Sequence, residues 1–412
     1  MAFENRFGID SVQGWVVVFA AFLAAFVVFG VSYTFGIFLR PIEEELHVTH
    51  AALSTVFSTM TVISFFLSPF TGRIADRHGP RRVVACGAVL MCAGLVATAR
   101  VPSFPLLFLT YGVGLGGAVA CTYIPAIAAV GGWFKVRRVI ALGVAVSGIG
   151  CGTLLAAPVS GMLIERHGWR AAIEILGWVG GGLMVVSALL LFRPPVLEEK
   201  AKFAIGPKLR TRAFALLYGS FFLKGIAVYV ALVFIPAYAM DLGATRVAAA
   251  SLVGYIGASS VVGRLGGSML APRFGLFNMY KLAFAILFVS YFLWITGHVY
   301  PTLVIFSLIM GVGYGGVAGM APAVTASLFG VQGLGQLLGV LFTALGIACL
   351  VGPPIAGLVI DYSHTYHSTP FYAAAAAALA LIVAIPLHKL EPETATLSSQ
   401  PIEVSMLYRH HW

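Results

Sequence analysis

Twelve long apolar stretches, separated by short charged or Pro/Gly-containing connections, constrain this sequence more than any other feature. A helix crosses a bilayer with about 20 mostly apolar residues, and 412 residues leave room for twelve such helices with short connections. Only 10% of the residues are charged and 60% are hydrophobic, whereas about a quarter of a soluble domain is charged. We therefore predict an all-α membrane protein with twelve transmembrane helices.

The apolar stretches divide into two sets of six around a polar segment. The first set is residues 14–38, 51–70, 83–99, 104–130, 139–164 and 171–191. The second set is residues 213–237, 247–270, 279–296, 302–328, 337–360 and 371–387. The predicted domains are an N-terminal six-helix bundle (1–192), a central cytoplasmic loop (193–212), a C-terminal six-helix bundle (213–388) and a cytoplasmic tail (389–412).

Lysine and arginine gather in alternate connections, which is the pattern that sets the orientation of membrane proteins. The rich connections follow the second, fourth and sixth stretches and carry Arg73, Arg77, Arg81, Arg82, Lys135, Arg137, Arg138, Lys200, Lys202, Lys208, Arg210 and Arg212. This pattern predicts a multi-pass protein of the cell inner (plasma) membrane with both termini in the cytoplasm. The net charge of +10 therefore reports topology, and we expect no nucleic-acid partner because the basic residues form no single face.

The two halves repeat each other in sequence. GVGLGGA from Gly112 in the fourth stretch corresponds to GVGYGGV from Gly311 in the tenth. APVSGMLIE from Ala157 is echoed by PPIAGLVID from Pro353, and an acidic residue closes both segments. A duplicated six-helix unit is typical of transporters with the major facilitator architecture. Small residues at such positions let helices approach closely in lipid.

The connection after the second stretch, GRIADRHGPRR from Gly72, resembles the cytoplasmic signature of the major facilitator superfamily. The resemblance implies a gating latch of charged and small residues that opens and reforms as the protein changes conformation, with Gly72, Asp76, Arg77, Gly79 and Arg81 as its members. The alternative is that these charges only set topology. The counterpart in the second half, APRFG from Ala271, lacks the acidic residue.

Within that superfamily the whole chain looks like the monocarboxylate transporter branch. The start of the first helix, DSVQGWV from Asp10, is similar to an acidic-Gly-Trp motif of that branch. The start of the fifth, WFKVRRVIALGVAVSG from Trp133, resembles its aromatic, basic and small-residue signature. The resemblance implies alternating-access transport of small carboxylates such as lactate, coupled to protons.

Two cations, Arg264 and Lys224, fall deep inside predicted helices. At about 1.5 Å per residue they lie at similar depth, ~12 Å and ~16 Å from the predicted cytoplasmic ends. Charges at such depth usually face a substrate pathway, and no Asp or Glu falls at that depth to pair with them. A guanidinium holds a carboxylate through two parallel hydrogen bonds, so we predict that Arg264 binds an anionic substrate. The family places its substrate-binding arginine in this helix.

The role of Lys224 is open among three alternatives. It is a second substrate contact, a proton carrier, or a lysine that bonds carbonyl oxygens and reaches toward the membrane surface. The resemblance does not decide, because Ser260 stands where many family members have an Asp, and Tyr33 aligns with a lysine of mammalian members.

Four tyrosines fall on helices that line the pathway in this family, and a buried tyrosine hydroxyl needs a polar partner such as a carboxylate. They are Tyr33, Tyr123, Tyr229 and Tyr314. For each one, packing in the helix bundle is the alternative role.

The sequence thus predicts a secondary transporter that moves a small monocarboxylate, such as lactate or pyruvate, by proton symport. A first alternative is an exchanger of dicarboxylate for formate, although residues 337–360 contain no basic residue where oxalate exchangers have one. A second is a drug exporter, which normally needs a membrane-embedded acid. We expect no enzyme, metal or cofactor, because no nucleophile-base pair, metal cluster or phosphate loop occurs in the sequence.

Overall fold

The computed structural model describes residues 11–134, 138–193, 206–330 and 334–390, and within these residues the chain forms helices and no strand. The first half contains α1 (Val12–Tyr33), α2 (Phe35–Leu46), α3 (His50–His78), α4 (Pro80–Thr98), α5 (Phe104–Leu107), the π-helix η2 (Phe108–Leu115), α6 (Gly116–Trp133) and α7 (Arg138–Leu190). The second contains α8 (Gly206–Leu209), α9 (Arg212–Asp241), α10 (Arg246–Phe274), α11 (Leu276–Ile295), α12 (Tyr300–Phe329), α13 (Leu334–Ser363), η3 (Tyr366–Ser368), α14 (Thr369–Ala384) and η4 (Ile385–Leu390).

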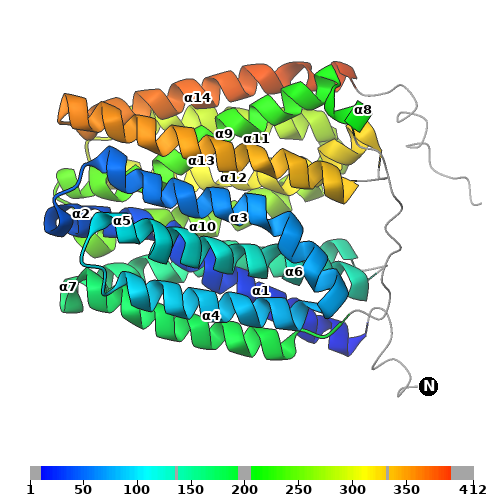
Figure 1. The fold of residues 1–412 in the computed structure, drawn as a ribbon. Helices are drawn as coiled ribbons and strands as arrows, with labels where there is room; N and C mark the ends of the chain where they lie inside the picture. Colours follow the sequence, from blue (N-terminus) through cyan, green and yellow to red (C-terminus); the bar gives the residue numbers. More distant parts are fainter. Residues whose placement is uncertain (1–10, 135–137, 194–205, 331–333, 391–412) are drawn as a thin grey trace, which may run out of the picture.

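In the described part of the chain, 11 helical segments are long and apolar enough to cross a membrane. One of them, α7, is two helices joined at Gly168, whose φ of 79° lies in the region that glycine adopts freely. The chain turns back at this residue (Figure 1). The described residues therefore make twelve crossings, and the predicted all-α membrane fold is confirmed.

Several helices extend beyond their apolar stretches. The first crossing continues through α2 to Leu46, and α3 runs on to His78. The apolar pattern ends earlier because it records only where lipid ends, whereas backbone hydrogen bonding continues into the polar region. The fourth crossing also differs from a plain α-helix, because the glycine-rich segment around Gly112 forms η2.

The bundle has two ends, which differ in charge. We call the end with the start of α1 and with α8 the basal end, and the end with the α2–α3 connection the distal end (Figure 1). All acidic residues of the described part except Asp76 lie at the distal end, as the directions of the helices show. They are Glu43, Glu44, Glu45, Glu165, Glu174, Asp241 and Asp361. Most cations of the described part lie at the basal end: Arg73, Arg77, Arg81, Arg82, Arg193, Lys208, Arg210, Arg212, Arg273 and Lys281.

Glycine allows the helices of each half to touch backbone to backbone. A Cβ on Gly152 of α7 would lie 2.0 Å from the carbonyl oxygen of Phe26 in α1. In the second half, a Cβ on Gly315 of α12 would lie 2.0 Å from the carbonyl oxygen of Ser260 in α10. Dispersion between such closely fitted surfaces replaces the hydrophobic effect that lipid cannot supply.

The two halves meet most closely near the distal end. A Cβ on Gly357 of α13 would lie 2.7 Å from Ala51 of α3, whereas Gly346, nearer the basal end, has its nearest neighbour at 3.4 Å. Helices α7 and α10 are also loosest toward the basal end, with a nearest neighbour at 4.0 Å for Gly143 against 2.5 Å for Gly150 and 3.2 Å for Gly161. Closer contact at one end than at the other is the geometry of two halves that rock against each other.

The contact between α10 and α12 provides a test of this packing. Gly263→Ala places a methyl group 2.1 Å from the carbonyl oxygen of Val312, whereas Gly266 on the same helix has no such neighbour within 4 Å. We expect Gly263→Ala to lower the unfolding free energy by about 1–3 kcal/mol, the usual cost of overpacking. Thermal unfolding of the purified variants measures this, with Gly266→Ala as the matched control. Equal melting temperatures for the two variants would contradict the packing described here.

Candidate functional site

Arg264 projects from α10 into the interface between the halves. Its Nη1 atom donates to the carbonyl oxygen of Val146 in α7 at 3.3 Å, and Nη2 donates to the Tyr314 hydroxyl of α12 at 3.5 Å. The guanidinium carbon also lies 5.6 Å from the centre of the Tyr314 ring. The Nε atom is buried without a hydrogen-bond partner. Part of the donor fork of Arg264 is thus left for another acceptor.

Lys224 of α9 is buried beside the same tyrosine, with 1% of its surface exposed. Its Nζ atom lies 4.5 Å from the centre of the Phe221 ring and 5.5 Å from the centre of the Tyr314 ring. Among the residues that the structure describes, no carboxylate pairs with Lys224 or Arg264. The ring faces attract the cations by about 0.5–2 kcal/mol but do not neutralise them.

The predicted tyrosines surround these cations. Tyr33 on α1, Tyr123 on α6 and Tyr229 on α9 all lie within electrostatic range of Tyr314, and Tyr33 and Tyr123 lie within range of Arg264 as well. The structure therefore brings together all six residues predicted for substrate binding, from α1, α6, α9, α10 and α12.

Sequence reasoning missed the residues that hold the tyrosines in place. The Phe29 ring packs 5.5 Å from Tyr33 and 4.9 Å from Tyr123, and the Phe57 ring lies 6.0 Å from Tyr229. With 30 phenylalanines in the chain, no sequence signal distinguishes these two. Ser260, which replaces an acid of the family, donates to the carbonyl oxygen of Gly257 in its own helix at 2.7 Å.

The arrangement suits an anion. Two cations in a low-dielectric interior carry an uncompensated desolvation cost, and an incoming carboxylate pairs with the guanidinium and supplies one negative charge. Because the donors come from α9, α10 and α12 while Tyr33 and Tyr123 come from the first half, a ligand at this position contacts both halves.

The predicted latch is helical and not a loop. Gly72, Asp76 and Arg77 lie in the last turns of α3, and Arg81 lies in the first turn of α4. Between them Gly79 has a φ of 90°, and its N–H donates to the carbonyl oxygen of Ala75 at 2.8 Å. The helices extend this far because charged side chains past the apolar run remain compatible with helix.

The contacts of the latch are only partly described. The carbonyl oxygen of Arg77 accepts from Nη2 of Arg193 at 3.4 Å, and the side chains of Arg77 and Arg81 are exposed. The side chain of Asp76 lies outside the described part of the structure. A gating role for these residues stays a prediction.

Comparisons with known proteins agree with this geometry. The family model described as "Major Facilitator Superfamily" matches residues 21–300 and 282–404. "Monocarboxylate transporter 12-B" of Danio rerio is 28% identical, over 88% of this chain and 84% of the relative. "Monocarboxylate transporter 4" of Rattus norvegicus is 25% identical, over 87% of this chain and 79% of the relative. These relatives confirm the resemblance to monocarboxylate transporters.

The fold is also that of a solved transporter. A bacterial homologue of the human lysosomal transporter Spinster superposes with a TM-score of 0.74, at 15% identity, and covers 93% of this chain and 99% of its own. The match extends over twelve crossings and both halves, and the family model spans nearly the whole described chain. The chain therefore belongs to the major facilitator superfamily, and it is a membrane transporter and not an enzyme.

Proposed function

We propose that the protein transports a small monocarboxylate, such as lactate or pyruvate, with Arg264 as the residue that binds the carboxylate. The observation that carries the proposal is the pair of neighbouring cations, buried Lys224 and half-buried Arg264, for which the described residues supply no counter-charge. The names of its relatives support a monocarboxylate as cargo. One carboxylate fits the unpartnered donor of Arg264, and the tyrosine hydroxyls donate to its second oxygen.

Binding and movement are linked by charge. In the empty site the guanidinium of Arg264 has no counter-charge among the described residues, so closing the halves around it costs more than closing them around an Arg264 paired with a carboxylate. The ligand therefore shifts the population toward the occluded state by its differential affinity for that state. The helices then rock about the glycine contacts that join α7 to α10 and α3 to α13.

The orientation we propose places the basal end in the cytoplasm, because it carries most of the cations. The distal end then faces outward from the cell inner membrane, and both termini lie inside. With the halves in contact at the distal end, the structure corresponds to a carrier closed toward the outside. The latch at Gly72, Asp76, Arg77, Gly79 and Arg81 then lies on the cytoplasmic side, where it is positioned to hold the halves in the opposite state.

We further propose that transport is proton symport and that Lys224 carries the proton. Its position beside Arg264 supports this role, because two neighbouring cations favour the loss of one proton when the anion is absent. The exchange of a dicarboxylate for formate is a second candidate, since the paired cations also suit two carboxylates. The two candidates are distinguished by comparing how strongly unlabelled oxalate and unlabelled pyruvate inhibit the uptake of labelled lactate.

Arg264→Ala tests the binding site. Truncating one partner of a buried charge pair costs about 2–5 kcal/mol, and each 1.4 kcal/mol is about tenfold in affinity. We therefore expect uptake of labelled L-lactate into proteoliposomes to fall to background, with normal membrane insertion.

The matched control for this test is Arg273→Ala, an exposed arginine on the same helix that stacks near Phe274. It should keep uptake close to the unchanged protein. Near-normal uptake by Arg264→Ala would refute the proposed site.

Lys224→Met tests the proton carrier. We expect it to remove the stimulation of lactate uptake by an inward proton gradient, while exchange of labelled for unlabelled lactate at equal pH continues at a reduced rate. Lys281→Met, at the start of α11, is the control. If uptake by Lys224→Met keeps its dependence on the proton gradient, Lys224 is not the carrier.

A further inference from the structure

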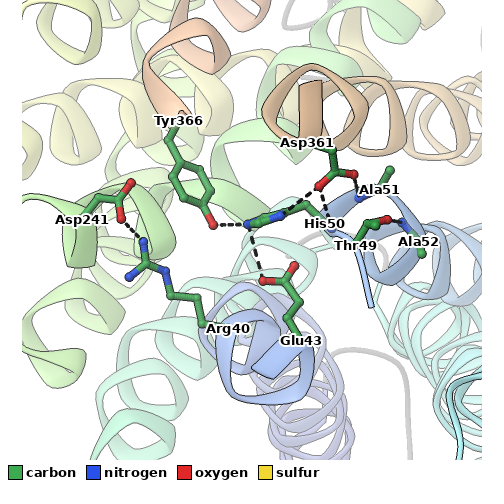
Figure 2. Close-up of polar contacts among 9 residues, drawn as sticks. All are labelled: Arg40, Glu43, Thr49, His50, Ala51, Ala52, Asp241, Asp361 and Tyr366. Atoms are coloured by element: carbon green, nitrogen blue, oxygen red, sulfur yellow. Dashed lines mark hydrogen bonds and ion pairs between the residues drawn. The ribbon is translucent and has the colours of Figure 1, made fainter. Parts of the chain in front are cut away.

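A second polar cluster, unrelated to the central cations, joins the two halves at the distal end (Figure 2). The first half contributes Arg40 and Glu43 from α2 and His50 from α3. The second half contributes Asp241 from α9, Asp361 from α13 and Tyr366 from η3. We call these six residues the distal cluster. Every pair described below links one half to the other, except Glu43 with His50.

Asp361 is fixed by the start of helix α3. Its two carboxylate oxygens accept from the backbone N–H groups of His50 and Ala51, each at 3.1 Å. The N-terminus of a helix favours a negative charge. These two bonds fix the carboxyl group of Asp361 in place, and its Oδ1 lies 3.0 Å from Nδ1 of His50. This contact needs a proton on Nδ1.

The other ring nitrogen of His50 faces two different oxygens. Nε2 contacts the Tyr366 hydroxyl and lies 3.4 Å from Oε2 of Glu43. A neutral imidazole accepts from the tyrosine through Nε2 and offers nothing to Glu43, whereas an imidazolium donates from both nitrogens. The pocket around His50 accordingly has partners for both protonation states.

Glu43 lacks a donor in this arrangement. Its side chain is 10% exposed, and Oε1 is buried with no hydrogen-bond partner. A buried carboxylate without donors is costly. One added proton, shared between His50 and Glu43, removes this cost, either by charging the imidazole or by neutralising the acid.

The charges around the cluster add up to an excess of carboxylates. The charged and titratable groups that line the same cavity as His50 are Arg40, Glu43 and Glu44 from α2, Asp241 from α9, Asp361 from α13, His364 directly after α13, and Tyr366 from η3. Arg40 is already paired with Asp241. All of these groups line a cavity of about 700 Å³, which also gives the cluster a route to water.

We propose that the distal cluster is a proton-binding site, with the bound proton shared by Glu43 and His50. The proton makes the contact between the two halves at the distal end, which we call the distal gate, respond to pH. When the halves meet, the carboxylate of Asp361 from the second half joins that of Glu43 beside the imidazole of His50, so the closed gate binds the proton more tightly than the open one. Acid at the distal side therefore closes the gate, and alkali favours its opening. This proton stays at the distal surface and is distinct from one that travels with cargo.

Accessibility of a cysteine at the gate tests the proposal without any transported substrate. Ile360 lines the cavity and is 3% exposed, so Ile360→Cys reacts with a hydrophilic thiol reagent only when the gate opens. The five native cysteines are first replaced by alanine, and the protein is labelled in detergent between pH 5.5 and 8. Rates are divided by those of Thr296→Cys, an exposed position at the same end, to remove the titration of the thiol itself.

We expect the corrected rate to rise severalfold from the acidic to the alkaline end of this range. Adding His50→Gln or Glu43→Gln should abolish the rise, because neither variant has the shared proton. His298→Gln is the matched control, since this exposed histidine lies at the same end and is not part of the cluster; it should leave the rise unchanged.

Each variant should elute from a gel-filtration column as a single folded species, so that the labelling rates can be compared. His50→Gln and Glu43→Gln then test the proposal independently of each other. A flat rate in the unsubstituted background overturns the proposal, as does a pH response that survives Glu43→Gln. Because no cargo is present, these outcomes are separate from any failure of lactate transport.

Discussion

The interior of this protein is organised around two positive charges that its own side chains do not neutralise. Lys224 is buried and Arg264 is half-buried at the junction of both halves, and their described partners are aromatic rings, one tyrosine hydroxyl and one backbone carbonyl oxygen. In a soluble protein, acidic side chains close to such charges would neutralise them. Here the acids lie at the membrane surface, so the electrostatic balance of the interior is completed by whatever the protein binds.

The repeat explains how a site of this kind is assembled. The interface pairs α3 with α13 and α7 with α10, while the repeat relates α3 to α10 and α7 to α13, so the two contacts are counterparts and close approach at Gly357 has its counterpart at Gly161. Charge breaks the symmetry. Both central cations come from the second half, while the first half contributes the hydroxyls of Tyr33 and Tyr123. One half thus carries the charge, and the other supplies neutral polar groups.

Much of this organisation is predictable from sequence, because lipid imposes a simple rule on composition. The twelve apolar stretches identify the crossings, and charges that interrupt them, such as Arg264, stand out without knowledge of the fold. Helix ends are less predictable, since Glu43 follows an apolar run that ends before the helix does. The distal cluster could not be predicted, because His50 meets Asp361 only through the packing of separate helices. Nothing in the local pattern around either residue indicates the other.

The corner at Gly168 has a mechanical consequence. The two crossings of α7 are joined without a loop, and Arg170 beside the corner donates to the carbonyl oxygens of Ala99 and Val101 at 3.0 Å and to Glu45 at 2.8 Å. The corner is thereby fastened to the ends of two other crossings. Because no flexible loop separates the two crossings of α7, a tilt of the crossing before Gly168 must also tilt the crossing after it. With the rocking of the halves that we propose above, the surrounding membrane is displaced in every cycle, and bilayer stiffness becomes part of the work of transport.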